Sequence, residues 1–151
     1  MRQNRTTVGL TIASDFNFVE LAEIVSTNLA KLVGFDDDTT MWIGMAVREA
    51  VINAIKHGNR QDQRKHVDLR FSINSDTMAV QVMDRGEGFD FTDLPNPLDP
   101  ENLLKPSGRG IFYIRTFMDK VEFSARPGGG TVVSMSRRKR SEGDGKKDVD
   151  H

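Results

Sequence analysis

The spacing of apolar residues along the chain predicts an alternation of strands and helices. Apolar side chains at every second position are typical of half-buried strands, and apolar side chains at helical spacing are typical of amphipathic helices. The period-two segments are 7–13, 67–73, 78–83, 121–125 and 131–135, and the helical segments are 17–33, 36–56 and 111–118.

Turn and cap residues divide these segments. Asn17 followed by Glu20 resembles a capping box that begins the first helix, and Gly34 suits its end. The turn sequences Asn74-Ser75-Asp76 and Pro127-Gly128-Gly129-Gly130 each separate two strands, which predicts two antiparallel hairpins. This order of elements predicts an α+β fold. We expect a two-layer α/β sandwich with a mixed, mostly antiparallel sheet and its helices on one face.

Residues 41–59 are apolar almost all the way round a helix, which predicts that this helix is buried. It nevertheless carries Glu49 and Asn53, which share one face because positions four apart are neighbours. Buried polar groups are costly unless they are satisfied. In a structural explanation, Asn53 caps a neighbouring loop and Glu49 pairs with Arg48 or Arg85. In a functional explanation, the amide oxygen binds magnesium and the carboxylate accepts a proton from an attacking hydroxyl.

Two glycine-containing segments suggest further chemistry. In Asp84-Arg85-Gly86-Glu87-Gly88, at a strand end, the acid can accept a hydrogen bond from an exocyclic amine and the glycines let backbone approach a flat ring. In Ser107-Gly108-Arg109-Gly110, before the third helix, backbone N–H groups suit phosphate. Taken singly, both patterns are weak signals. The second is not a Walker loop, because the Gly-Lys-[Ser/Thr] ending is absent.

The chain changes character in two further places. Residues 91–107 hold four of the five prolines, so they cannot form a long helix or a central strand. Long loops inside compact domains are functional or disordered. Residues 137–151 are polar, and we expect them to form a disordered tail behind a single domain at 1–136. Phosphate binding by the basic run 137–140 is the alternative to a solvated strand exit.

Composition narrows the function classes. The formal net charge of −1 gives no electrostatic case for binding nucleic acid or an anionic membrane. The chain has no cysteine, which fits a reducing cytoplasm, and no apolar run long enough to span a bilayer. His57, His66 and His151 show no metal-ligand spacing, so a structural zinc site is not expected. We therefore expect a cytoplasmic protein.

In this order the motifs resemble the GHKL ATP-binding superfamily, which includes gyrase and the histidine kinases and has the Bergerat α/β sandwich fold. The resemblance covers about residues 7–136. The matching motifs are the N-box Glu49-x-x-x-Asn53, the glycine boxes Asp84-x-Gly86-x-Gly88 and Gly108-x-Gly110, and the terminal Gly130-Thr131. Within the superfamily, Glu49-Ala-Val-Ile-Asn53-Ala-Ile-Lys-His57-Gly58 is similar to the anti-sigma factor serine/threonine kinases.

The resemblance implies that ATP and Mg²⁺ bind. It implies that Asn53 holds the metal and that Glu49 is the general base toward the hydroxyl of a protein substrate. The other implied binding residues are Asp84 for the adenine amine, Gly86, Gly88 and Thr131 around it, and Gly108 and Gly110 for the phosphates. The resemblance also implies that residues 91–107 form a lid that closes over the phosphates.

Two residues of this pattern have open roles. His57 matches the motif, either with a role at the nucleotide or as a helix-end residue bonded to backbone. Arg109 either reaches the γ-phosphate or points to solvent or a partner.

The leading hypothesis is an ATP-dependent protein serine/threonine kinase of the anti-sigma type. It would phosphorylate a STAS-type antagonist and bind a sigma factor, with a possible homodimer through the exposed strand edge at 7–13. The alternative is a non-catalytic ATP-binding switch that controls a partner through lid ordering, which the presence of Glu49 disfavours. A sensor histidine kinase is disfavoured because no phosphoacceptor helix precedes the N-box, and a topoisomerase fragment because no transducer follows.

Overall fold

The computed structural model describes residues 4–86 and 113–140. The expected lid at 91–107 and the predicted site residues Gly88, Gly108, Arg109 and Gly110 lie outside the described residues.

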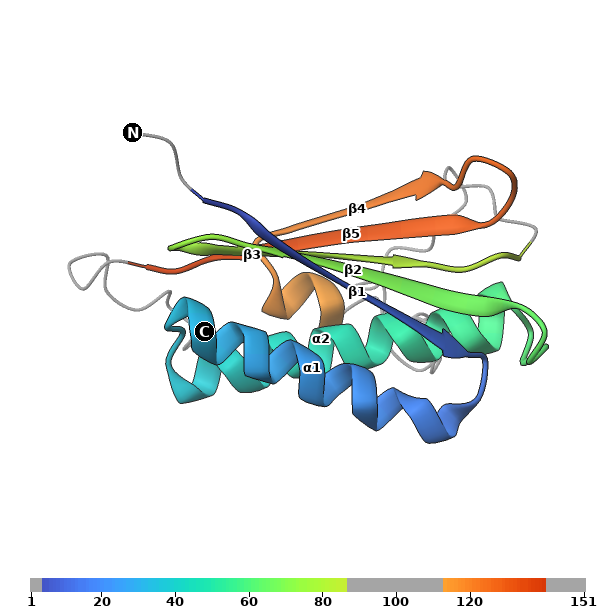
Figure 1. The fold of residues 1–151 in the computed structure, drawn as a ribbon, viewed down its shortest axis with the longest axis horizontal. Coiled ribbons are helices and arrows are strands. Elements are labelled where there is room, and N and C mark those ends of the chain that lie inside the picture. Colours follow the sequence, from blue (N-terminus) through green and yellow to red (C-terminus); the bar gives the residue numbers. More distant parts are fainter. Residues whose placement is uncertain (1–3, 87–112, 141–151) are drawn as a thin grey trace, which may run out of the picture.

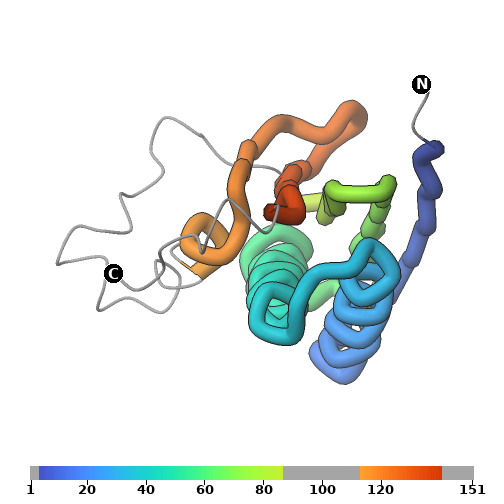
Figure 2. The backbone as a smooth tube through the Cα atoms, turned by 90° about the vertical axis from the view of Figure 1, so that its left-hand side faces the viewer, coloured from blue at the N-terminus to red at the C-terminus, as the bar shows by residue number. Residues whose placement is uncertain are grey.

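The described chain forms a five-stranded sheet with helices on one face, as the sequence predicts (Figure 1). The strand order is β1-β2-β3-β5-β4, and all four neighbouring pairs are antiparallel. The elements are β1 (Thr6–Ala13), η1 (Phe16–Phe18), α1 (Val19–Val33), α2 (Asp37–Asn53), η2 (Ala54–Gly58), β2 (His66–Ile73), β3 (Thr77–Met83), β4 (Lys120–Ala125) and β5 (Thr131–Arg138). Viewed end-on, α1 and α2 run side by side beneath the sheet (Figure 2).

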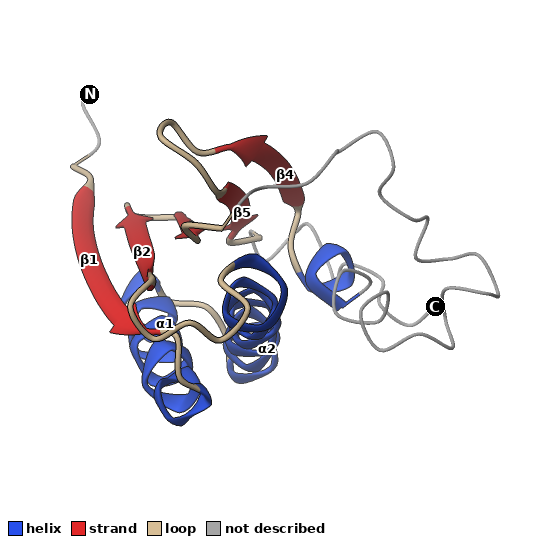
Figure 3. Cartoon of the chain, turned by 90° about the vertical axis from the view of Figure 1, so that its right-hand side faces the viewer, coloured by secondary structure: helices blue, strands red, loops and turns tan. Residues whose placement is uncertain are grey.

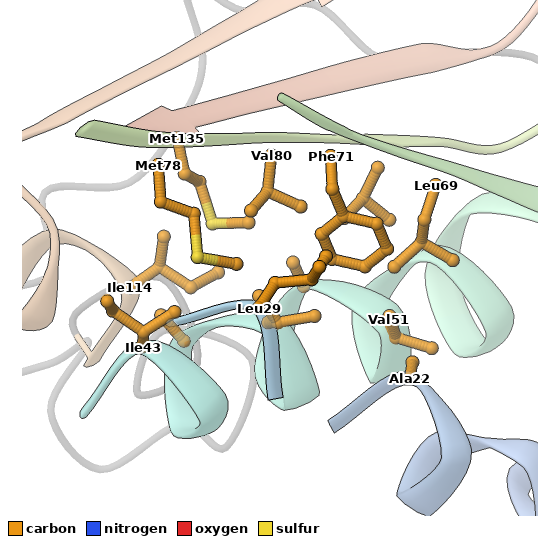
Figure 4. Packing of buried hydrophobic residues seen from close by; sticks show 14 of the residues in the cluster. Ala22, Leu29, Ile43, Val51, Leu69, Phe71, Met78, Val80, Ile114 and Met135 are labelled. Atoms are coloured by element: carbon orange, nitrogen blue, oxygen red, sulfur yellow. The ribbon is translucent and has the colours of Figure 1, made fainter. Parts of the chain in front are cut away.

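The core lies between the two layers. The central strands alternate as predicted, so that one face of each is buried, and the side chains from strands and helices point toward one another (Figure 4). The sheet contributes Phe71, Met78 and Val80, all fully buried, against Ile43 and Val51 of α2. A short helical segment at 113–117 closes the layer beside α2 (Figure 3).

The first helix begins differently from the prediction. Asp15, in extended conformation, caps the 3-10 turn η1 by accepting a hydrogen bond from the Asn17 backbone N–H at 2.9 Å. The expected capping box at Asn17 is therefore wrong, because Asn17 already lies inside that turn. Gly34 ends α1 as predicted, in the left-handed region with a φ of 105° that costs a glycine little.

The second helix is capped at its N-terminus by an acid. Asp36 accepts a hydrogen bond from the Thr39 backbone N–H at 2.8 Å, and this bond lowers the pKa of Asp36. The helix is not buried on all sides, which corrects the prediction for 41–59: Met41 is 52% exposed. Its last regular residue is Asn53, and a wide π-type turn, η2, continues to Gly58.

β5 runs to Arg138, beyond the expected domain limit at residue 136. Arg137 is only 3% exposed and donates a hydrogen bond to the Phe117 carbonyl at 2.6 Å. Its guanidinium carbon lies 5.6 Å from the centre of the Trp42 ring. The basic run 137–140 therefore begins inside the sheet, because strand alternation turns residue 137 toward the helices, as it does Met135.

Candidate functional site

Asp84 is a buried acid directly after β3. Its Oδ1 accepts hydrogen bonds from the backbone N–H groups of Gly86, at 2.9 Å, and Thr131, at 3.1 Å. Its own N–H donates to the Thr131 carbonyl at 3.0 Å, which extends the pairing of β3 with β5. The carboxylate is thus fixed through one oxygen. No group in 4–86 or 113–140 donates to Oδ2, so this oxygen can accept a further hydrogen bond.

Three glycines surround this carboxylate because no side chain fits. A Cβ on Gly58 would lie 2.2 Å from Asp84 Oδ2, and one on Gly130 would lie 2.2 Å from the Asp84 carbonyl. A Cβ on Gly86 would lie 1.9 Å from the Gly58 carbonyl. The end of η2, the end of β3 and the turn before β5 therefore meet closely at Asp84.

Gly58 is a site residue that sequence reasoning missed. The sequence assigns it the end of a helix, whereas the structure places it against the Asp84 carboxylate. Its position directly after His57 in the motif was the available signal. Gly130 was quoted for its motif but given no such contact, and its φ of 115° also requires glycine.

Asn59 is a second missed residue, and it ties three segments together. It is 1% exposed, and its Oδ1 accepts a hydrogen bond from the Arg85 N–H at 2.7 Å. Its Nδ2 lies 2.8 Å from Ser14 Oγ and within hydrogen-bond distance of the Lys65 and His66 carbonyls. It therefore holds the start of the Asp84-x-Gly86 segment against the ends of β1 and β2.

Glu49 and Asn53 lie one turn apart on α2, and both are half-buried. The structural explanation for Glu49 fails in the described chain, since Arg48 pairs with Glu23 at 3.2 Å and Arg85 pairs with Asp68 at 3.1 Å. Neither Glu49 nor Asn53 has a hydrogen-bond or ion-pair partner among residues 4–86 and 113–140. Both side chains are therefore available to a ligand.

His57 lies in η2, next to this pair, and its side chain is exposed. Burial, and to a lesser degree the charge of Lys56, lower the pKa of His57 from its ordinary value. Its ring makes no hydrogen bond to a backbone group within the described part of the chain, so the helix-end alternative finds no support there.

A network of polar side chains on the face of the sheet opposite the helices contacts the backbone of Asp84. Arg126 donates to the Asp84 carbonyl at 3.1 Å and to Asp68 at 2.9 Å. Asp68 also accepts from Thr11 and Arg85. Burial alone would raise the pKa of Asp68, but these three hydrogen bonds outweigh it and lower the pKa. The strand ends around Asp84 are thus braced on both faces of the sheet.

The polar side chains of this site suit a nucleotide with its metal ion better than a metal ion bound by protein side chains alone. No group of three or more His, Asp or Glu side chains in the described residues could hold a metal ion. A single amide oxygen, from Asn53, matches magnesium, which keeps most of its ligands as waters and phosphates. Asp84 has one oxygen held by two backbone N–H groups and another that accepts no hydrogen bond from the described residues, so its carboxylate suits a purine amine. None of the helices that the structure describes is long and apolar enough to cross a membrane.

The comparison with protein families defines the class. The family model described as a histidine kinase-like ATPase domain matches residues 13–137. This stretch contains both halves of the site built above, the Glu49–Asn53 helix and the Asp84 strand end. The class is thus that of the ATP-binding domains of the histidine kinase type, and ATP binding is a property of that class.

The individual relatives narrow this further. The chain is 32% identical over 137 residues to the serine-protein kinase RsbW of Halalkalibacterium halodurans, covering 87% of this chain and 82% of the relative. It is 26% identical over 143 residues to RsbW of Bacillus subtilis, covering 91% of this chain and 88% of the relative. The chain therefore belongs to the histidine kinase-like ATPase domain family and, within it, to the family of RsbW, the anti-sigma factor serine kinases.

A solved structure agrees on the fold. The RsbU and RsbW domains of a Mycobacterium tuberculosis protein superpose with a TM-score of 0.64 at 16% identity, covering 90% of this chain and 33% of that one. At that identity the match concerns the fold alone. The predicted fold class and the predicted family are both confirmed, whereas the roles of the single site residues stay predictions.

Proposed function

We propose that the chain is an ATP-dependent protein serine/threonine kinase of the anti-sigma type. The observation that carries this proposal is the pair Glu49 and Asn53, half-buried on α2 with no partner among the described residues. ATP binding alone would need Asn53 and the Asp84 region. A carboxylate without an ionic partner, one helical turn from the metal ligand, has a use in proton transfer.

Asp84 recognises the adenine. Its Oδ2 accepts a hydrogen bond from the exocyclic amine, while Oδ1 stays bonded to the N–H groups of Gly86 and Thr131. Because both donors belong to backbone, the carboxylate cannot rotate away when the nucleotide arrives. Thr131, at the start of β5, is 3% exposed and lies beside this carboxylate.

Asn53 and Glu49 act at the phosphate end. The Asn53 amide oxygen would hold Mg²⁺, a cation that takes amide oxygens as ligands. Bound Mg²⁺ supplies positive charge that offsets the phosphate oxygens during transfer. The substrate hydroxyl oxygen bonds to the γ-phosphorus as the bond to the β–γ bridging oxygen breaks, and the hydroxyl proton passes to the Glu49 carboxylate. Phosphoprotein and ADP are the products.

The remaining assignments rest on the motif alone. We assign Gly88 to the adenine, Gly108 and Gly110 to the phosphates, and Arg109 to the γ-phosphate, with residues 91–107 as the lid. We place His57, on the turn that follows Asn53, near the phosphates. The proposed partners are a STAS-domain antagonist, whose serine or threonine is phosphorylated, and a sigma factor, and the unpaired edge of β1 offers a surface for a homodimer.

The test is phosphoryl transfer from labelled ATP and Mg²⁺ to the STAS-domain protein encoded beside this chain. We expect Glu49→Gln to bind ATP normally and to transfer at least about a hundredfold more slowly, because proton transfer is lost. Asn53→Ala should lose magnesium-dependent nucleotide binding. Glu20→Gln, on the exposed first turn of α1, is the matched control and should transfer as the wild type does.

The proposal fails if no phosphoprotein forms and Glu49→Gln binds its partners as the wild type does. That outcome would favour the non-catalytic switch. If both site variants instead unfold while their residual native fraction binds nucleotide normally, Glu49 and Asn53 are structural.

A further inference from the structure

The face of the sheet opposite the helices is open and carries a groove of about 430 Å³. In Figures 1 and 3 the helices all lie on the other face. Four small residues of the groove, Thr7, Ser72, Ala79 and Ser136, are successive partners across β1, β2, β3 and β5. Lys120 of β4 pairs with Ser136 and ends the row. The groove therefore crosses the strands.

The groove is positively charged. Arg5, Arg70 and Lys120 line it together with one carboxylate, that of Glu122. None of these four forms an ion pair or a side-chain hydrogen bond with another residue in 4–86 or 113–140. The chain as a whole carries a formal charge of −1, so this excess of positive charge is local.

The other arginines on this face behave differently. Arg85 and Arg126, near the opposite ends of the same strands, share the carboxylate of Asp68 at 3.1 Å and 2.9 Å. Their charge is compensated within the chain. The three cations of the groove lack such a carboxylate, which leaves them available to an anionic ligand.

The shape of the groove limits that ligand. Five strands spaced at about 4.8 Å span roughly 19 Å, the length of about six residues of extended chain. Hydroxyl and methyl groups between the strands suit a polar polypeptide, and none of the described residues that line the groove is aromatic, so bases find no ring to stack on there. A two-fold contact with a second copy would set cations against cations.

We propose that this groove docks an extended acidic segment, about six residues long, of a partner protein. Charge complementarity with Arg5, Arg70 and Lys120 would steer and hold the segment. Asp84 meets Gly58 on the helix side of the sheet, so the groove and the nucleotide site lie on different faces. The inference is therefore independent of phosphoryl transfer, and both sites can be occupied together.

The test is the binding of a fluorescein-labelled hexaglutamate peptide, followed by fluorescence anisotropy without nucleotide. We expect wild-type binding to weaken as salt is raised. Arg70→Glu combined with Lys120→Glu should weaken it by about tenfold or more, since two attractive charges become repulsive. Arg64→Glu is the control: its side chain is 90% exposed and outside the groove, and its peptide affinity should match that of the wild type.

Three results would overturn the proposal. The first is no peptide binding at about 1 mM, or equal binding by the wild type and the double variant. The second is full competition by ATP, which would place the peptide in the nucleotide site. The third is a wild-type dimer in sedimentation that the double substitution dissociates, with no peptide bound by either protein. Tighter binding of a thymidine hexanucleotide than of hexaglutamate would also overturn the proposal. Circular dichroism of the double variant should show unchanged folding, because both side chains are exposed and unpaired.

Discussion

Asp84 and Arg137 are both charged and buried, but their partners differ in kind. Asp84 lies where β3 ends, and one of its oxygens takes two backbone N–H groups while the other takes none from the described residues. Arg137 lies near the other end of β5. It has one backbone acceptor, the face of Trp42, and an ion pair in which its Nε lies 4.0 Å from the Asp119 carboxylate. At that distance the Nε makes no hydrogen bond, and it is the one buried side-chain nitrogen or oxygen in residues 4–86 and 113–140 without one.

This difference suggests separate roles for the two residues: ligand recognition for Asp84 and packing for Arg137. An acid that the backbone holds rigidly, with one oxygen that accepts no hydrogen bond from the described residues, suits the ligand-binding role that we propose for Asp84. An arginine that lies over the Trp42 ring and bonds to the Phe117 carbonyl and Asp119 fills the layer between the sheet and the 113–117 segment. Burial lowers the pKa of Arg137, but an arginine keeps its charge, so this charge is a cost of packing and not a tool of chemistry.

The largest effect should come from closing the space around Asp84. A Cβ in Gly86→Ala would lie 1.9 Å from the Gly58 carbonyl, so backbone must shift. We expect a loss of about 3 kcal/mol in the free energy of unfolding, measured by urea denaturation. Gly9→Ala is the control, because its Cβ would meet nothing within 4 Å. Equal stability of the two variants would contradict the close contact.

The next effect concerns the open oxygen. Asp84→Asn keeps an oxygen for the N–H groups of Gly86 and Thr131 but replaces the acceptor for the adenine amine with a donor. We expect about a hundredfold weaker ATP binding by calorimetry with little change in stability. An ATP affinity near that of the wild type would make Asp84 a packing residue like Arg137.

Arg137 should behave in the opposite way. Arg137→Met loses the bond to the Phe117 carbonyl and the ion pair with Asp119, but it also removes a buried charge and an Nε without a hydrogen bond. These terms offset one another, so we expect stability to change by less than about 1 kcal/mol and ATP affinity not to change. The fluorescence of Trp42, the single tryptophan, should report the altered contact. Strongly weakened ATP binding would show that the two regions are coupled.

The smallest expected effect is a pH dependence of stability that arises from Asp68, in the polar network next to Asp84. The pKa of Asp68 is lowered below its ordinary value of 3.8, so its contribution to stability is complete above that value and is lost as the pH falls through the lower, folded value. Asp68→Asn should remove this part of the acid sensitivity. Thermal unfolding between about pH 5 and pH 2 should then show a shallower loss of stability than in the wild type. Parallel curves would assign the acid sensitivity to other groups.

Local sequence determined most of the fold. The alternation in 67–83 and 121–135 predicted both hairpins, because side-chain direction in a strand depends only on neighbouring positions. Gly34 likewise marked a helix end from its own conformational freedom. The capping box at Asn17 failed at the same level, since Asp15 competes for the same backbone groups two residues earlier.

Motif order also predicted the family, which the comparisons confirmed, and it singled out Glu49, Asn53, Asp84 and Thr131. Within 4–86 and 113–140 the side chains of the first two have no partner, and Asp84 is fixed by the backbone N–H of Thr131. The sequence did not anticipate that Gly58 contacts Asp84 or that Asn59 holds Arg85, because each contact joins residues 26 positions apart in the chain.

Tertiary structure alone decided which charges are buried. By composition Arg137 belonged to a basic tail, yet the pairing of β5 with β3 carries it over Trp42. Arg5, Arg70 and Lys120 are unremarkable in sequence, and only strand register gathers them at one groove. Sequence pattern fixes which residues alternate, but the packing of distant elements decides what each side chain meets. That is why the Glu49–Asn53 pair was readable from the chain, whereas its surroundings were not.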